Sequence, residues 1–158
     1  MRENHQMLQL ATLGAVWAVL SVAHTLADHV LGQSDHQAAH KAAPTREQID
    51  AGTSPRRGWG ACLAHVGQYH AVVVGVYWLV GLAVALPATW LGATTAIGWS
   101  AFTHAILDRR WIVRAILEHT GSPKFATLQS DGISGPYLAD QAHHATALLG
   151  SAVLLARL

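Results

Sequence analysis

The chain has 158 residues, the size of one domain, and only 12% of them are charged. Soluble globular proteins carry about 25% charged residues, so a soluble domain of this size would lack charge for its surface. The net charge of +1 excludes a general attraction to nucleic acid, and the single cysteine, Cys62, excludes an intrachain disulfide.

Three long segments contain no charged side chain. No Asp, Glu, Lys or Arg occurs between Glu3 and Asp28, between Arg57 and Asp108, or between Asp140 and Arg157. A membrane-spanning helix needs about 20 apolar residues. The first segment is therefore long enough for one span and the second for two, whereas the third is marginal. The start of the chain lacks a basic region followed by a small-residue cleavage site, so we expect the first span to be retained and not removed as a signal peptide.

The first predicted element is a long apolar helix over residues 6–31. Gly32 is expected to end it, because glycine readily adopts the left-handed conformation that closes helices. Residues 33–57 are polar and contain two prolines, which predicts a loop with a short helix over residues 45–51. Thr45 and Gln48 have the spacing of a capping box at the start of that short helix.

A second long helix is predicted over residues 59–86. Pro87 is expected to end it, because proline lacks the amide donor and clashes with the preceding turn. After a tight hairpin, a third helix is predicted over residues 88–119, and residues 122–135 are expected to form a loop. Pro136 suits the first turn of a fourth helix that runs to residue 158, since a backbone donor is not needed there.

Basic residues in short loops predict the orientation of these helices, because such residues are enriched on the cytoplasmic side. Most of them fall in residues 32–58 and 109–135: Lys41, Arg46, Arg56, Arg57, Arg109, Arg110, Arg114 and Lys124. The opposite side has only Arg2 and Arg157. The sequence therefore predicts an all-α fold, an integral membrane bundle of four transmembrane helices that forms a single domain over residues 1–158. Its expected location is the inner (plasma) membrane, with both termini outside and the two basic loops in the cytoplasm.

Histidines and aspartates recur at a spacing of four residues on the predicted helices. The pairs are His24 with Asp28, His104 with Asp108 and, in reverse order, Asp140 with His144, and His65 and Tyr69 share the spacing. Residues i and i+4 lie on one face of a helix, so each pair can direct its polar atoms at one point. In the predicted topology all four groups lie near the cytoplasmic ends of their helices. That orientation depends on Lys and Arg, which take no part in the pairs.

Neutral imidazoles and carboxylates together suit divalent metals such as Zn, Mn or Fe. A bound metal would offset the cost of placing ionisable groups near hydrocarbon, about 2.5–3.5 kcal/mol each at the bilayer centre. It would also lower the pKa of a bound water and so support hydrolysis. The expected metal ligands are His24, Asp28, His65, His104, Asp108, Asp140 and His144. A histidine or carboxylate would act as general base, with Asp28, Asp108 and Asp140 as the catalytic candidates.

Other polar residues have simpler explanations. Gln33 and Lys41 would either orient a substrate anion at the cytoplasmic mouth or be ordinary loop residues. His70 is a candidate for a residue that supports a ligand, and His143 points about 100° away from His144 and is left outside the site. We expect the remaining histidines of the polar segments to be solvated: His29, His36, His40 and His119.

These residues resemble a family of small bacterial membrane proteins of unknown function that is related to the membrane-bound metal-dependent hydrolases. The matching pattern, of the His-x3-Asp-x4-Gln type, is His24-Thr-Leu-Ala-Asp28, Gln33, Lys41, His65, Tyr69, His104-Ala-Ile-Leu-Asp108, Asp140-Gln141 and His144. It spans nearly the whole chain. The resemblance implies a four-helix membrane protein with a metal-dependent hydrolase site, in which Gln33, Lys41, Tyr69 and Gln141 are expected to contact substrate.

Three functions are open on the sequence. The first is a membrane-embedded metal-dependent hydrolase that acts at the cytoplasmic interface on a phospholipid or another phosphoester. The second is a non-catalytic protein that binds or moves a metal or protons, although the outer halves of the helices offer only weak polar groups for such a path. The third is a membrane scaffold whose polar cluster specifies helix packing. The expected partners are the lipid bilayer and a lipid or phosphoester substrate, without nucleic acid, and a homo-oligomer is compatible with all three.

Overall fold

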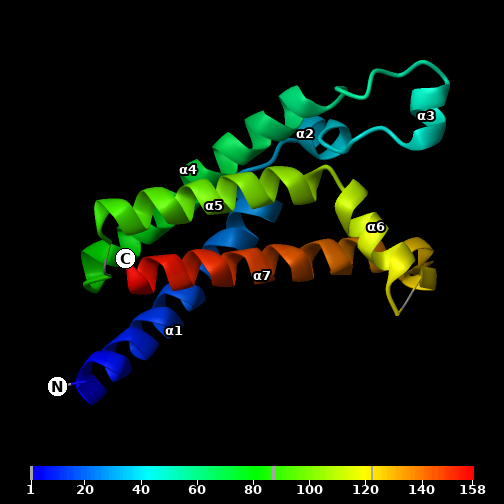
Figure 1. Ribbon diagram of the computed structural model, residues 1–158. Helices are drawn as coiled ribbons and strands as arrows, with labels where there is room; N and C mark the ends of the chain where they lie inside the picture. Colours follow the sequence, from blue (N-terminus) through cyan, green and yellow to red (C-terminus); the bar gives the residue numbers. More distant parts are fainter. Residues whose placement is uncertain (1, 87, 122) are drawn as a thin grey trace.

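The computed structural model describes residues 2–86, 88–121 and 123–158. The described residues form four long helices, namely α1 (Arg2–Leu26), α4 (Trp59–Ala83), α5 (Trp90–Asp108) and α7 (Gly135–Arg157). Helices α5 and α7 run side by side, and α1 crosses them at a steep angle (Figure 1). Both termini and the α4–α5 connection lie at one end of the molecule, and the shorter elements lie at the other (Figure 1). The chain is thus mainly helical, as the sequence predicts.

The shorter elements connect the long helices. They are a π-helical turn η1 (Ala27–Leu31) that continues α1, helices α2 (Asp35–His40), α3 (Arg46–Asp50) and α6 (Trp111–His119), a 3-10 helix η2 (Pro123–Thr127), and strands β1 (Gln129–Ser130) and β2 (Ile133–Ser134). The two strands pair antiparallel. Helix α2, η2 and this hairpin lie in segments that were expected to be loops. Pro87 and Ser122, which mark a predicted helix end and a predicted loop start, lie outside the described residues.

Local capping explains where the short helices begin. Helix α3 starts with the predicted capping box, in which Thr45 Oγ1 accepts from the Gln48 amide and Gln48 Oε1 accepts from the Thr45 amide. Ser34 and Gln37 form the same motif at the start of α2. Helix α7 begins with proline in its first turn, as expected, and the Ser134 hydroxyl accepts from a backbone amide there.

The predicted helix over residues 88–119 is wrong, because the chain turns between α5 and α6. Arg110 adopts a left-handed conformation with φ 62°, which stops the helix directly after Asp108. Long-range contacts hold the turn. The buried Arg109 guanidinium donates to the carbonyl oxygens of Lys41 at 2.9 Å and Arg57 at 2.6 Å, and it lies 4.8 Å from the ring centroid of Trp59. The two carbonyl partners are 68 and 52 residues away, so no local pattern marks the break.

Gly32 ends the first helical segment, but not for the predicted reason. Its φ is −100°, which is not left-handed, and its amide donates to the Ala27 carbonyl at 2.8 Å, closing the π turn. A Cβ atom at this position would collide with the Ala27 carbonyl oxygen and lie 3.1 Å from Tyr69 Cα. Glycine is needed here because η1 and α4 approach each other closely.

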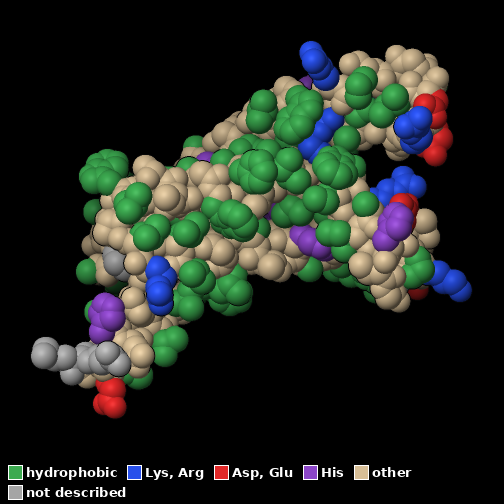
Figure 2. Space-filling view, in the orientation of Figure 1, with side chains coloured by type: hydrophobic (Ala, Val, Ile, Leu, Met, Phe, Trp, Pro, Cys, Tyr) green, Lys and Arg blue, Asp and Glu red, His purple; other side chains and the backbone are tan. Residues whose placement is uncertain are grey.

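Much apolar surface remains exposed on the long helices. Figure 2 shows apolar side chains across the middle of one face, with most of its charged groups toward the ends. Among the described residues, two helical segments are long and apolar enough to cross a membrane, Glu3–Leu31 and Trp59–Ala83. Only 17% of the most apolar stretch of α4 is buried. A core helix of a soluble protein would be mostly covered, whereas most of this stretch of α4 is exposed.

The two larger apolar clusters among the described residues each join three of the helices. One joins α1, α4 and α7 through Val16, Leu20, Ala23, Ala27, Tyr69, Val73, Leu148 and Ala152. The other joins α5, α6 and α7 through Leu107, Val113, Leu117 and Ala139. Several of these residues are alanines, which allow the helix backbones to approach closely.

Candidate metal centre

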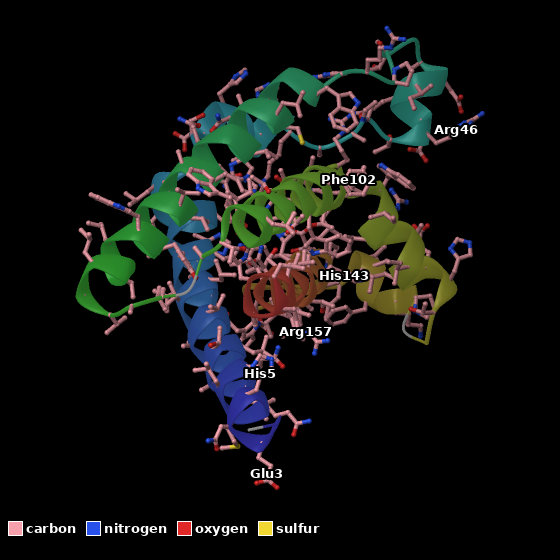
Figure 3. The ribbon with its side chains drawn as sticks, turned by 60° about the vertical axis from the view of Figure 1, so that its left-hand side comes forward. Glu3, His5, Arg46, Phe102, His143 and Arg157 are labelled. Carbon is pink, nitrogen blue, oxygen red and sulfur yellow. The ribbon has the colours of Figure 1, made fainter. Side chains whose placement is uncertain are left out.

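The predicted ligands come together from all four long segments of the bundle. They fall into three groups, and the ligand atoms within each group lie within 4.8 Å of one another: His24, His104 and His144; Asp28, His65, His104 and Asp108; Asp108, Asp140 and His144. All are buried except Asp140, which is half-buried. In Figure 3 side chains fill the space between α1, α4, α5 and α7, and the labelled Glu3 and Arg46 lie far from it. These buried groups could hold a metal ion.

We call Asp28, His65, His104 and Asp108 the central group. His65 Nε2 lies 3.0 Å from Asp28 Oδ1, 3.3 Å from Asp108 Oδ2 and 3.1 Å from His104 Nε2. His104 Nε2 also lies 3.3 Å from Asp108 Oδ2. Two imidazole nitrogens and two carboxylate oxygens thus face one small volume that solvent barely reaches.

The hydrogen bond at Nδ1 fixes the tautomer of a neutral His65 ring. His65 Nδ1 lies 2.9 Å from the Gly32 carbonyl oxygen, which can only accept, so Nδ1 carries a proton. In a neutral ring, Nε2 then has a lone pair that points at a carboxylate oxygen and at a second histidine. Lone pairs repel unless a proton or a cation lies between them. A carbonyl that holds Nδ1–H while Nε2 faces inward is the usual support for a metal-binding histidine.

His24 is held differently from His65, because both of its ring nitrogens bond to uncharged side chains. Gln141 donates its amide hydrogen to Asp28 Oδ2 at 3.2 Å, which leaves Gln141 Oε1 to accept from His24 Nε2 at 3.3 Å. His24 Nδ1 then accepts from the Tyr69 hydroxyl at 3.0 Å. The Tyr69 ring in turn packs on His104, with centroids 4.0 Å apart. In this arrangement His24, Tyr69 and Gln141 orient the central group.

We call Asp108, Asp140 and His144 the lateral group. The His144 ring stacks on His104, with centroids 4.4 Å apart and an angle of 9° between the planes. Within the described part of the chain, neither ring nitrogen of His144 nor Asp140 Oδ1 has a hydrogen-bond partner, although all three atoms are buried. Buried polar atoms without partners are rare and call for a water or an ion. The lateral group is therefore chemically incomplete.

Lys41 lies inside the cluster and not at an open mouth. Its side chain is buried, and Nζ lies 2.8 Å from Asp108 Oδ1 and 3.7 Å from Asp28 Oδ1. With neutral histidines and all three aspartates ionised, these aspartates and Lys41 leave two net negative charges around the centre. Burying uncompensated charge is costly, and one divalent cation would neutralise it.

Sequence reasoning missed the residues that hold Lys41 in place. Arg109 ties the loop that contains Lys41 to the end of α5, and burial lowers the pKa of its guanidinium without removing the charge at neutral pH. The only local signal is an arginine directly after Asp108.

Gln33 donates to the Asp28 carbonyl at 3.2 Å, so it contacts the centre through the backbone. His29 is exposed, as expected, and it also lies 3.2 Å from the Tyr137 hydroxyl.

Other histidines lie outside the centre. His70 bonds to the Val66 carbonyl at 2.7 Å and to the Ser100 hydroxyl at 3.0 Å, and its ring lies 6.2 Å from that of His104. His143, labelled in Figure 3, donates to the Ala139 carbonyl at 2.6 Å. His36 and His40 are exposed and stack on each other, as solvated residues can.

An apolar cavity of about 440 Å³ adjoins the centre. It lies between α4, α5 and α7, and its wall consists mainly of Val, Leu, Ala and aromatic side chains. Ser100 and Leu148 line both this cavity and a small pocket that His24, Tyr69, His104 and His144 also line. The volume is within the 300–1,000 Å³ range of small-molecule sites.

Comparisons with protein-family models, curated proteins and solved structures find no match to this chain. The function proposed below therefore rests on the chemistry and geometry of the centre.

Proposed function

We propose that this chain is a membrane-embedded metal-dependent hydrolase that acts at the cytoplasmic interface on a phospholipid or another phosphoester. One observation carries the proposal. His65 Nδ1–H donates a hydrogen bond to the Gly32 carbonyl, so Nε2 faces Asp28, Asp108 and His104. A cation among these atoms would remove the repulsion between their lone pairs. Histidine and carboxylate ligands favour Zn, Mn or Fe.

The membrane topology is part of this proposal. We infer that α1, α4, α5 and α7 span the bilayer, with both termini outside. The arrangement in Figure 1 supports this, because both termini lie at the end opposite α2, α3 and α6. The basic residues predicted to be cytoplasmic lie in those short elements and their connections. The centre is then close to the cytoplasmic surface, where water and headgroups are available.

Each residue has a definite task in this scheme. Asp28, His65, His104 and Asp108 would hold the ion, and Gln141 and His24 keep Asp28 in position. When bound, such an ion lowers the pKa of water and so favours hydrolysis near neutral pH. Asp140 has a buried oxygen without a partner, which can accept a proton from water. Lys41 supplies positive charge for a phosphate group.

The apolar cavity supports an amphiphilic substrate. It shares Ser100 and Leu148 with the pocket beside His104 and His144, so an acyl chain in the cavity would place its ester close to the centre. The cavity is formed by the helices proposed to face lipid. A lipid could enter from the bilayer without crossing water.

A second candidate is a scaffold in which the polar cluster only specifies helix packing. The contact between Lys41 Nζ and Asp108 Oδ1 favours it, because an ammonium ion already compensates one carboxylate there. This reading predicts that loss of the cluster disturbs folding while no ion is bound in the native chain.

Metal analysis of the purified full-length protein in detergent tests the proposal. We expect at least one tightly held Zn, Mn or Fe ion per chain and hydrolysis of a fluorescent short-chain phospholipid or of bis(p-nitrophenyl) phosphate. The double variant Asp28→Asn and Asp108→Asn should lose bound metal and at least 100-fold in rate. His143→Ala, a neighbouring histidine outside the centre, should change neither. A native protein without metal, or a double variant that keeps it, would overturn the proposal.

A further inference from the structure

Among the described residues, two of the three groups that could hold a metal share only Asp108. Asp108 belongs both to the central group, with Asp28, His65 and His104, and to the lateral group, with Asp140 and His144. No group of ligand atoms within 4.8 Å of one another contains both Asp28 and Asp140, over the described residues. Ligand atoms about 2.0–2.2 Å from one ion lie at most about 4.4 Å apart. One ion therefore cannot bind to both groups at once.

The lateral group has its own unmet bonding capacity. His144 is 2% exposed, and both of its ring nitrogens lack a hydrogen-bond partner among the described residues. Asp140 Oδ1 is also buried without a hydrogen-bond partner among the described residues. Stacking on His104 keeps the His144 ring in place without using either nitrogen. An ion bound in the central group would not supply a partner for the His144 nitrogens or for Asp140 Oδ1.

We propose that the centre binds two divalent ions, with Asp108 as the bridging carboxylate. This inference rests on the proposed function and adds a second site to it. Asp28, His65 and His104 complete the first site, and Asp140 and His144 complete the second, so Asp140 would hold an ion there in place of accepting a proton from water. The second site has only three protein ligands, which is the number found in catalytic sites that keep a position for water or substrate.

The second ion narrows the class of substrate. Paired ions about 3.5–4 Å apart recur in phosphatases and nucleases, where they stabilise both the attacking and the leaving oxygen of an in-line displacement. Two divalent ions would convert the two net negative charges of the cluster into two net positive charges. An anionic phosphate ester would be attracted to this positive charge, and an uncharged carboxylic ester would not. A phosphate ester is therefore the favoured substrate, in preference to a carboxylic ester.

Manganese titration of the full-length protein tests this inference by metal content and electron paramagnetic resonance. The native chain should bind two Mn²⁺ ions with a spin-coupled spectrum. The variant Asp140→Asn with His144→Ala should bind one, with the resolved hyperfine lines of an isolated ion. Asp28→Asn should also remove the coupling, and His143→Ala should match the native chain. Circular dichroism and gel filtration establish that each variant is folded.

The outcomes separate the two proposals. One Mn²⁺ in the native chain that is lost in Asp28→Asn would overturn the second site and leave the proposed function standing. No Mn²⁺, Zn or Fe in the folded native chain would overturn both. Two Mn²⁺ ions without spin coupling, or two that persist in the Asp140 and His144 variant, would overturn the bridging role of Asp108.

Discussion

At the residue scale, Lys41 places an ammonium ion within 2.8 Å of Asp108 Oδ1 and 3.7 Å of Asp28 Oδ1, so it lies beside two of the proposed ligands. Its charge opposes the entry of a divalent ion but favours a substrate phosphate. Coulomb energies at such distances reach about 4 kcal/mol for an effective dielectric constant of 20. One side chain can therefore weaken metal affinity and strengthen substrate binding.

This dual position gives a prediction for Lys41→Met. The variant should bind Mn²⁺ at least tenfold more tightly, about 1.4 kcal/mol, because a positive charge beside both carboxylates is gone. Hydrolysis of a phosphoester should fall at least tenfold at saturating metal. Calorimetric titration and the hydrolysis assay measure the two effects. Lys124→Met, which removes an exposed lysine in η2, is the matched control. Weaker Mn²⁺ binding in Lys41→Met would contradict the electrostatic role.

At the element scale, the contact between η1 and α4 links helix packing to the centre. Gly32 brings its carbonyl to His65 Nδ1 and its Cα close to Tyr69. A larger residue would push η1 away from α4, and Asp28 is part of η1. The packing of these two elements therefore sets the distance between Asp28 and His65.

We expect Gly32→Ala to destabilise the protein by about 1–3 kcal/mol, as overpacking usually does, and to weaken metal binding at the same time. Gly14→Ala in α1 is the control, because a Cβ there meets nothing within 4 Å. That change should be neutral or raise stability by up to about 1 kcal/mol, since alanine favours helix. Thermal unfolding with and without Mn²⁺ measures both variants. Equal melting temperatures would show that the close approach is not required.

The spacing of residues predicts elements and faces better than it predicts the contacts between them. Four-residue spacing placed His24 with Asp28 and His104 with Asp108 because both members of each pair lie on one helix. It could not reveal that Lys41 is buried against Asp108, since a loop carries Lys41 there. The break after Asp108 and the π turn before Gly32 were missed for the same reason. The break depends on bonds to residues distant in sequence, and the π turn packs against Tyr69, which is also distant.

At the scale of the whole molecule, polar and apolar groups are unevenly distributed. The polar elements and most basic residues lie at one end, and both termini lie at the other (Figure 1). Exposed large apolar side chains occur along the length between them, such as Trp78, Leu79 and Phe102. This distribution is the one expected of a bundle surrounded by lipid.

Cysteine labelling in sealed membrane vesicles tests this topology. Asn4→Cys should react with a membrane-impermeant maleimide only from the outer side, and Glu47→Cys and Lys124→Cys only from the cytoplasmic side. All three positions are exposed. The native chain is the background control, because Cys62 is buried. Labelling of Asn4→Cys and Glu47→Cys from the same side would contradict the proposed arrangement.

The Arg109 guanidinium bonds to the carbonyls of Lys41 and Arg57, and so it closes the intervening segment into a ring at its base. The outer part of that ring, around α3 and Gly52, is exposed. Extra sequence inserted at Gly52 would extend the ring outward without loosening its base. A fluorescent tag or an affinity handle placed there would therefore leave the position of Lys41 unchanged, and it gives a means to attach the protein to a sensor surface.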